Sequence, residues 1–201
     1  MQLLCTLTSP FARKVRMFAL EKGVADRVEL RLSNPLDDPE DLLRVNPLAK
    51  IPALLLDDGT PLYDSRVICE YLDSLADAPV MIPSSGDLRW AVMRRQALAD
   101  GLMDAAVSVV FEHRRPPTEQ SPHWLDRWDG KIRRAVATLD AEHARQPLEL
   151  GRLDGIAAAA ALAYLDFRLP ELDWHDASPG LAAWWLETAQ CPCVVDTAPP
   201  A

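Results

Sequence analysis

The sequence is short of basic residues and of long apolar runs, and each shortage excludes a class of protein. Its 21 lysines and arginines stand against 30 aspartates and glutamates, which gives a net charge of −9. A chain this acidic would repel a phosphate backbone, so nucleic acid is excluded as the main partner. No apolar stretch approaches the roughly 20 residues that a membrane-spanning helix needs, so we expect no membrane association.

Cysteine is also scarce. The four cysteines in 201 residues are too few and too scattered for a disulfide framework, which favours a reducing cytoplasm. The first five residues are apolar too briefly, and lack the basic flank, to be a signal peptide. We therefore expect a soluble, acidic protein of the cytoplasm.

The first third of the chain alternates between strand and helix patterns. With 49% apolar and 25% charged residues the chain is long enough for one large or two small cores. Periodicity and turn residues predict strands over 1–6, 28–32 and 51–56 with a hairpin partner at 62–63, and helices over 11–22, 41–45 and 65–75. This order describes a small sheet with helices packed on it, an α/β unit over residues 1–77.

The character changes after a linker. Residues 78–85 hold two prolines and two serines, and no convincing strand follows them. Helices are predicted over 88–113, from 121 towards 146, over the alanine-rich and nearly uncharged 156–168, and from 179, before a loose proline-rich tail. We expect a second, all-helical domain over residues 86–201.

Ser9 stands between the first predicted strand and the helix that Pro10 opens. Serine at the N-cap and proline at the first helical position are both favoured on structural grounds alone, so capping is one interpretation. The other is chemical. A thiolate at this helix end would accept a hydrogen bond from Ser9 and feel the positive end of the helix dipole, which lowers the pKa of the thiol.

Two further segments also admit two interpretations. Ile51-Pro52 is an ordinary trans proline at a strand start, or a cis turn that leaves the backbone of Ile51 free to pair with an extended peptide. Asp64-Ser65 opens the helix over 65–75 with Ser65 as the expected N-cap. The same pair could hold an amino-acid head group, its carboxylate on the helix N–H groups and its ammonium on Asp64.

Together these segments resemble the glutathione transferase superfamily. The resemblance rests on Ser9-Pro10-Phe11, on Asn46-Pro47 through Ile51-Pro52, and on Asp64-Ser65 followed by Glu70-Tyr71-Leu72. It covers the whole chain and is strongest to bacterial members with a serine at the active position. It implies a thioredoxin-like α/β domain that binds glutathione, an all-α C-terminal bundle and a homodimer.

The resemblance also implies roles for individual residues. Ser9 would be the catalytic residue that stabilises the glutathione thiolate, and Ile51, ahead of cis-Pro52, would pair with the cysteinyl part. Asp64 and Ser65 would hold the γ-glutamyl group, with Lys50 near the glycyl carboxylate. The electrophile pocket would begin at Phe11, and its other wall would come from three residues that share a helix face, which in another interpretation are plain core: Met103, Val107 and Phe111.

The sequence departs from the family pattern at two places. The family often begins its central C-terminal helix with Ser or Thr three residues before an Asp, whereas Gly151 stands at that offset from Asp154. No cysteine occupies position 9, and Cys5 lies inside a predicted strand, so a covalent mixed disulfide with the enzyme is disfavoured.

Three other features are ambiguous. Cys191 and Cys193 are a redox pair, half a metal site or two cysteines in a helix-ending turn, and we expect no metal because nothing nearby completes a site. His113-Arg114-Arg115 either steers an anionic substrate or is a charge-favoured helix end. Asp100 resembles acids found near the subunit boundary of the family, where it could reach the partner's glutathione.

The expected function is the conjugation of glutathione, a co-substrate and not a bound cofactor, to a small hydrophobic electrophile, as in detoxification. One alternative is a reductase of disulfides or peroxides that uses two glutathiones. Another is a non-catalytic binding or regulatory module on the same fold.

Overall fold

The N-terminal part of the protein is built on a small mixed sheet. The structure, a computed structural model, describes residues 1–200. The strands lie in the order β2-β1-β3-β4, with β2 parallel to β1 and the other pairs antiparallel. Their bounds are Gln2–Cys5 for β1, Glu29–Leu32 for β2, Ala53–Leu55 for β3 and Pro61–Leu62 for β4. The predicted α/β unit is confirmed.

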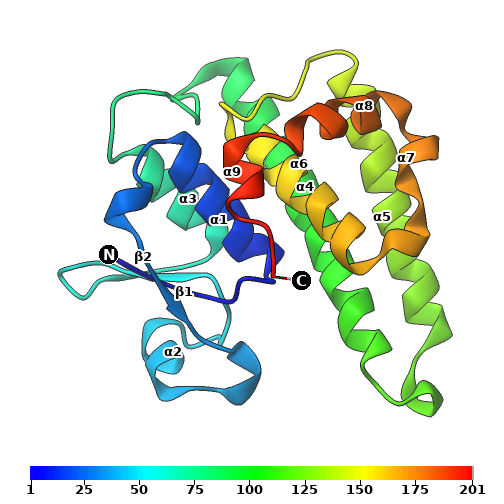
Figure 1. The fold of residues 1–201 in the computed structure, drawn as a ribbon, viewed down its shortest axis with the longest axis horizontal. Coiled ribbons are helices and arrows are strands. Elements are labelled where there is room, and N and C mark those ends of the chain that lie inside the picture. The colour runs from blue at the N-terminus through cyan, green and yellow to red at the C-terminus, as the bar shows by residue number, and fades with distance from the viewer. Residues whose placement is uncertain (201) are drawn as a thin grey trace.

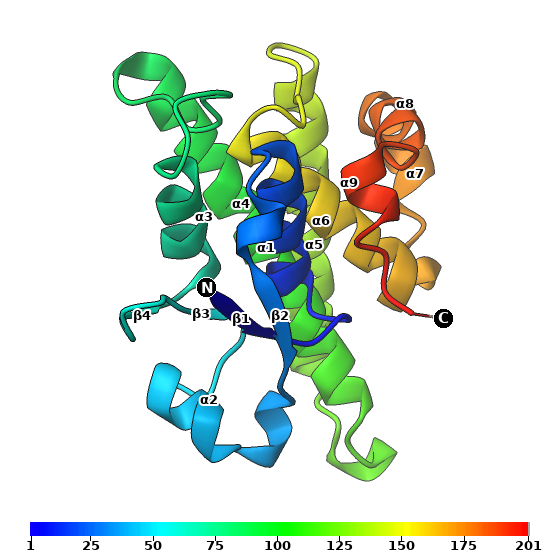
Figure 2. The same ribbon diagram turned by 60° about the vertical axis from the view of Figure 1, so that its left-hand side comes forward.

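Helices cover both faces of the sheet because successive side chains of a strand point to opposite faces. Leu3 and Cys5 enter the main core, whereas Leu4 and Ala53 enter a small core under α2. Figure 2 shows α1 and α3 above the sheet and α2 below it. These helices are α1 (Pro10–Glu21), α2 (Glu40–Val45) and α3 (Ser65–Asp73).

The C-terminal part consists of helices, with α6 at its centre (Figure 1). Residues 157–162 of α6 are fully buried, and five of the six are alanine. Because alanine side chains are small, α4 and α1 can both pack closely against this helix. The helices are α4 (Gly86–His113), α5 (Pro122–His143), α6 (Leu153–Arg168), α7 (Trp174–Ala177), α8 (Pro179–Thr188) and α9 (Pro192–Val195). Single 3-10 turns lie at η1 (Ala25–Arg27), η2 (Pro35–Asp37), η3 (Pro117–Glu119) and η4 (Pro170–Leu172).

The segment predicted as a linker is docked on its neighbours. Met81 and Ile82 are buried, and their backbone N–H groups donate to the Asp73 carboxylate at 3.2 and 3.1 Å. The ammonium of the buried Lys22, which follows α1 as its C-cap, lies 2.8 Å from Asp73 and donates to the Pro79 carbonyl at 2.6 Å. One lysine–aspartate pair thus holds residues 79–82, the middle of the connection between the two parts.

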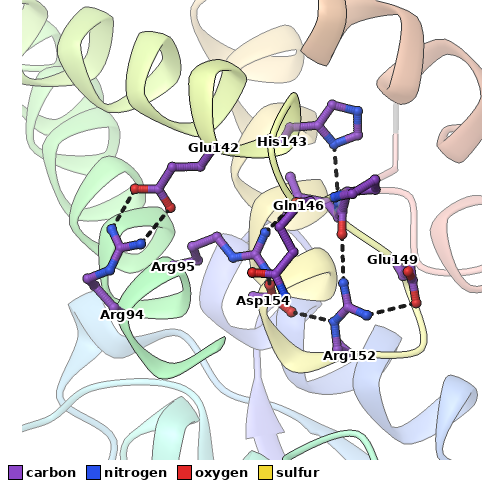
Figure 3. A network of polar contacts seen from close by, with 10 residues as sticks. Arg94, Arg95, Glu142, His143, Gln146, Glu149, Arg152 and Asp154 are labelled. Atoms are coloured by element: carbon purple, nitrogen blue, oxygen red, sulfur yellow. Dashed lines mark hydrogen bonds and ion pairs between the residues drawn. The ribbon is translucent and has the colours of Figure 1, made fainter. Parts of the chain in front are cut away.

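The start of α6 differs from the expected capping arrangement. The N-cap is Arg152, not Gly151, and the Arg152 side chain makes no capping hydrogen bond. Asp154 is fully buried and pairs with the Arg95 guanidinium of α4, with Arg152 at 3.5 Å (Figure 3). Burial raises the pKa of Asp154, and both arginines act against that shift. Ion pairing therefore anchors this helix start where a capping side chain is absent.

The same arginines hold the loop between α5 and α6. Arg95 donates to the Gln146 carbonyl at 2.8 Å, and Arg152 donates to the Pro147 carbonyl at 2.6 Å. Figure 3 shows these contacts beside the pair between Arg94 of α4 and Glu142 of α5. The loop is therefore held at Gln146 by α4 and at Pro147 by the start of α6.

The C-terminal segment is not the loose tail that the sequence suggested. It forms α9, which packs against α1, and the buried Arg13 guanidinium of α1 donates to the Val194 carbonyl at 2.9 Å and to Thr197 Oγ1 at 3.4 Å. Cys191 lies in the turn that ends α8, where its N–H donates to the Thr188 carbonyl at 3.0 Å, and is at the same time the N-cap of α9, which contains Cys193. Burial raises the pKa of the Cys193 thiol, which leaves it unreactive.

Candidate functional site

Ser9 caps α1 as the sequence predicts. Its Oγ accepts a hydrogen bond from the Ala12 N–H at 3.3 Å, and Pro10 occupies the first helical position. No acidic residue stands in the first turn of α1, so the positive end of the helix dipole is not neutralised from within the helix. The half-buried Ser9 hydroxyl keeps its proton free to donate, since the capping bond uses only a lone pair.

Ile51 lies just outside the sheet. The Ile51–Pro52 peptide bond is cis, and among residues 1–200 Ile51 makes no backbone hydrogen bond. The preceding turn is held by the buried Asn46, whose Nδ2 donates to the Lys50 carbonyl at 2.8 Å and whose Oδ1 accepts from the Leu48 N–H at 3.1 Å. The amide and carbonyl of Ile51 are therefore available to an extended ligand.

Asp64, and not Ser65, is the N-cap of α3. Its Oδ1 accepts from the Arg66 N–H at 2.9 Å, whereas the buried Ser65 is the first helical residue. A carboxylate caps as well as a hydroxyl, and its second oxygen remains free. The Asp64 side chain is exposed, so it can meet an ammonium group from solvent.

Strand register brings these three segments to one edge of the sheet. The pairing of Leu4 with Ala53 sets Ile51 beside the residues that follow β1 and lead to Ser9. The pairing of Leu54 with Leu62, continued by two residues, sets Pro52 opposite Asp64. The chain therefore places all three predicted binding segments together, although the first and the last are 55 residues apart in sequence.

Asp100 of α4 lies behind this edge in a buried ion-pair cluster. Its Oδ1 is 2.6 Å from Lys14 Nζ of α1 and its Oδ2 is 2.8 Å from Arg66 Nε of α3. Both side chains are buried, with exposed fractions of 1% for Asp100 and 0% for Lys14. With both oxygens occupied inside the subunit, Asp100 is not free to reach a partner's glutathione. Sequence reasoning missed Lys14 and Arg66 because no local pattern links residues so far apart.

Asp104, one turn further along α4, is the exposed acid of this region. Burial and the charge of Asp100 raise its pKa, and the charges of Lys50 and Arg66 act to lower it. Lys50 is exposed and directly precedes Ile51, so it lies at the same edge of the sheet as Asp64. The site is thus lined by charges of both signs, as a zwitterionic ligand requires.

The predicted electrophile face becomes more exposed along α4. Met103 is fully buried, Val107 is partly buried and Phe111 is 44% exposed. Phe11, next to Ser9, is partly buried against the same core. Met103 is therefore a core residue, whereas Phe111 presents its ring to solvent.

A cavity of about 250 Å³ lies on the other side of α4, between α4, α5 and the segment after α6. Its lining includes Val109 and His113 of α4 and Ile132 of α5.

The structure contains no candidate metal site among residues 1–200, because nowhere in this range do three or more His, Cys, Asp or Glu side chains come close enough together to hold an ion. None of the helices described is long and apolar enough to cross a membrane.

Known proteins match this chain over its whole length. Residues 8–75 match the family described as glutathione S-transferase, N-terminal domain. The GST-like protein YibF of Escherichia coli K12, called uncharacterized, is 35% identical over 87% of this chain and 86% of its own length. The chain belongs to the glutathione transferase superfamily. Its observed fold, with the mixed sheet first and the helices after it, is the fold of that superfamily.

Two solved glutathione transferase structures contain the tripeptide. The family member from Pseudomonas fluorescens Pf-5, with bound glutathione, is 44% identical with a TM-score of 0.95 and covers 100% of this chain and 99% of that one. The glutathione S-transferase from Methylobacillus flagellatus KT, with glutathione bound, is 39% identical with a TM-score of 0.91 over 99% of both chains. Glutathione is thus the ligand of similar transferases.

Proposed function

We propose that this member of the superfamily is a glutathione transferase that binds glutathione at the sheet edge formed by Ser9, Ile51 and Asp64 and conjugates it to a small electrophile. The observation that carries the proposal is the convergence there of a hydroxyl at a helix start, an unpaired backbone and an exposed carboxylate at a second helix start. The solved relatives with bound glutathione support it.

In this proposal each segment has one task. The γ-glutamyl ammonium lies on Asp64 and its carboxylate at the N–H groups of α3, beginning with Ser65. The cysteinyl backbone pairs with Ile51 ahead of Pro52, and Lys50 meets the glycyl carboxylate. The Ser9 hydroxyl donates to the thiolate sulfur at the positive end of α1.

Ser9 acts by stabilising the thiolate. Lowering a thiol pKa from about 8.5 to about 6.5 requires roughly 2.7 kcal/mol of preference for the thiolate. A charge-assisted hydrogen bond and a helix start supply most of that amount. The sulfur then attacks an electrophile held against Phe11 and the exposed end of α4, near Val107 and Phe111.

A route through a protein disulfide lacks a suitable cysteine. Cys5 lies next to this edge, but it is fully buried and burial raises its pKa. Cys69 is also buried, with its pKa raised to about 12. The activity belongs in the cytoplasm, where glutathione is kept reduced and where free cysteines persist, as all four are here.

We further propose that the protein is a homodimer that pairs through α3 and α4. Trp90, Ala97 and Gly101 lie on one line along α4, because residues 7 and 11 positions apart return to nearly the same angle. Trp90 is 69% exposed and Val67 of α3 is 44% exposed. A second subunit would cover this apolar line.

Isothermal titration of the protein with glutathione tests the binding site. Asp64→Asn keeps an oxygen that can cap α3 but removes the charge that holds the ammonium, so we expect binding to weaken tenfold or more, at least about 1.4 kcal/mol. Asp26→Asn, which changes an exposed aspartate in η1, should bind as the wild type does.

Absence of glutathione binding by the wild type would exclude both conjugation and glutathione-dependent reduction, and would leave a binding module for another ligand. If glutathione binds, turnover of small disulfides compared with turnover of aryl halides separates reduction from conjugation. Binding without any turnover would indicate a non-catalytic module.

A further inference from the structure

The cavity between α4, α5 and the segment after α6 has an apolar floor. Three buried residues form it, Val109 of α4, Ile132 of α5 and Leu169 after α6, with exposed fractions of 8%, 1% and 2%. The partly buried Leu125 and Leu172 extend it. A cavity of roughly 150 Å³ with apolar walls holds a benzene molecule. The volume of about 250 Å³ therefore has room for one ring and a short chain.

One side chain ties together two walls of the cavity. The Arg133 guanidinium of α5 lies 2.8 Å from the Asp129 carboxylate, one turn earlier in the same helix, and donates to the Leu172 carbonyl of η4 at 3.4 Å. All three residues line the cavity. Arg133 thus fastens η4 to α5, and Asp129 neutralises its charge.

Two other carboxylates of the lining are left without a partner. Asp126 of α5 and Glu171 of η4 are exposed, and among residues 1–200 neither side chain makes an ion pair or a hydrogen bond. Because Arg133 and Asp129 neutralise each other, Asp126 and Glu171 give the cavity a net negative charge. The apolar lining is buried and these two acids are exposed, so the negative charge lies at the mouth, towards solvent.

The cavity is separate from the proposed electrophile face. Val107 and Phe111 stand two positions from Val109 on either side, which is ~200° around α4. Since Val109 lines the cavity, Val107 and Phe111 point to the opposite side of the helix. α4 packs against both α5 and α6, so its body lies between the two sides (Figure 1).

The composition of the lining selects the kind of ligand. The acids are not grouped in the way that a metal ion needs within residues 1–200. An apolar floor favours a hydrocarbon or aromatic body that leaves water, and two unpaired carboxylates at the mouth favour a positive group that donates hydrogen bonds. One small molecule with both features satisfies the whole lining.

We propose that this cavity is a binding site for a small organic cation, an ammonium group on a single ring with a short chain. The ring lies on the floor of Val109, Ile132 and Leu169, and the ammonium meets Asp126 and Glu171 at the mouth. The site is additional to the glutathione site and does not depend on conjugation.

The test compares two probes that differ in one group, 2-phenylethylammonium and 2-phenylethanol, with 3-phenylpropionate as the anion. Protein labelled with ¹⁵N is titrated at pH 8, where histidine is uncharged, so that His113 adds no charge to the cavity. We expect the ammonium to bind about tenfold more tightly than the alcohol, the anion to bind least, and the amide shifts to change at residues 109, 132 and 169. High salt should reduce the preference.

Asp126→Asn and Glu171→Gln should each weaken binding of the ammonium by about two- to fivefold, the range of an exposed ion pair, and leave the alcohol unaffected. The double variant should bind the ammonium no better than the alcohol. Glu187→Gln is the matched control, because Glu187 is an exposed acid of α8 that does not line the cavity. It should bind all three probes as the wild type does.

Val109→Phe places a ring where the ligand ring would lie, so it should weaken binding of the ammonium and of the alcohol alike. Unfolding curves show whether this buried substitution folds. If it does not, the two acid variants still decide, since their side chains are exposed.

Equal affinity of the wild type for the three probes, or shifts confined to other residues, would overturn the proposal. So would a preference for the ammonium that survives in the double variant. Saturating glutathione should leave the affinity unchanged, and competition between the two would also refute a site on the far side of α4. A wild type that fails to bind glutathione would instead contradict the proposed function alone.

Discussion

Asp100 shows how one buried residue can support a site that it does not touch. It joins Lys14 of α1 to Arg66, which follows the two residues proposed to hold the γ-glutamyl group. Removing one member of a buried ion pair leaves an uncompensated charge. We expect Asp100→Asn to lower the free energy of unfolding by about 3–5 kcal/mol, measured by urea denaturation.

Asp104→Asn is the matched control, one turn along the same helix. The pKa of Asp104 is raised in the folded protein from 3.8, so folding disfavours its charged form. Folded protein then binds more protons than unfolded protein just above pH 3.8, and this group makes stability fall as the pH rises through that range. Asp104→Asn should therefore be neutral or slightly stabilising at pH 7. If it lowered the free energy of unfolding as much as Asp100→Asn does, this account would be wrong.

Ser9 has a structural and a chemical task at once, and they can be separated. Ser9→Ala should cost about 1 kcal/mol of stability as a lost N-cap. It should also raise the apparent pKa of bound glutathione, followed by the ultraviolet absorbance of the thiolate, and lower turnover. Ser9→Thr keeps a hydroxyl and should retain most of the stability and most of the turnover. Unchanged thiol titration in Ser9→Ala would remove Ser9 from the mechanism.

At the scale of elements, α9 depends on a side chain of α1. Arg13 is buried, and burial lowers its pKa to about 10, yet it is held by the Val194 carbonyl and Thr197. Hydrogen bonds to a charged group contribute about 1.5–3 kcal/mol. Arg13→Gln should lower the free energy of unfolding by that amount and speed hydrogen exchange in residues 192–197, whereas Arg145→Gln, at an exposed arginine that follows α5, should do neither. Unchanged exchange there would show that α9 holds without Arg13.

The longer elements could be predicted from periodicity, and the short ones could not. The helix patterns over 11–22, 88–113 and 121–146 end within a few residues of α1, α4 and α5. α7 and α9 have four residues each, too few for a periodic pattern, and they are held by tertiary contacts from Asp166 and Arg13. The N-caps at Asp64 and Arg152 each differ by one residue from the expected position. At α3 the reason is that the Asp64 carboxylate accepts from the Arg66 N–H and so takes the cap that Ser65 was expected to fill.

At the scale of the molecule, the proposed dimer can be tested with a glycine. A Cβ added at Gly101 meets nothing within 4 Å, so Gly101→Arg should fold as a subunit. Its long side chain would separate two helices that approach at this line. We expect sedimentation velocity to change from dimer to monomer, and expect Trp124→Glu, at another tryptophan that is 47% exposed, to leave a dimer. A monomeric wild type would contradict the proposal.

The candidate site was more predictable than its surroundings. Turn and capping patterns single out the segments near 9, 51 and 64, because short segments carry such patterns by themselves, and the resemblance to the family supplied the roles proposed for them. The partners of Asp100 depend on how α4 packs on α1 and α3, and single-sequence patterns carry no information on such pairs.

The ion-pair cluster at Asp100 limits which chimeric proteins can be assembled from the two parts of this fold. The sheet part contributes Lys14 and the helical part contributes the carboxylate that neutralises it, so the two parts are not interchangeable modules. A chimera that joined residues 1–77 to another helical bundle would inherit a buried ammonium without a counter-ion unless the donor bundle offered an acid at the equivalent turn. Compatibility between the halves of hybrid transferases should thus be decided by a charge match at one interior position.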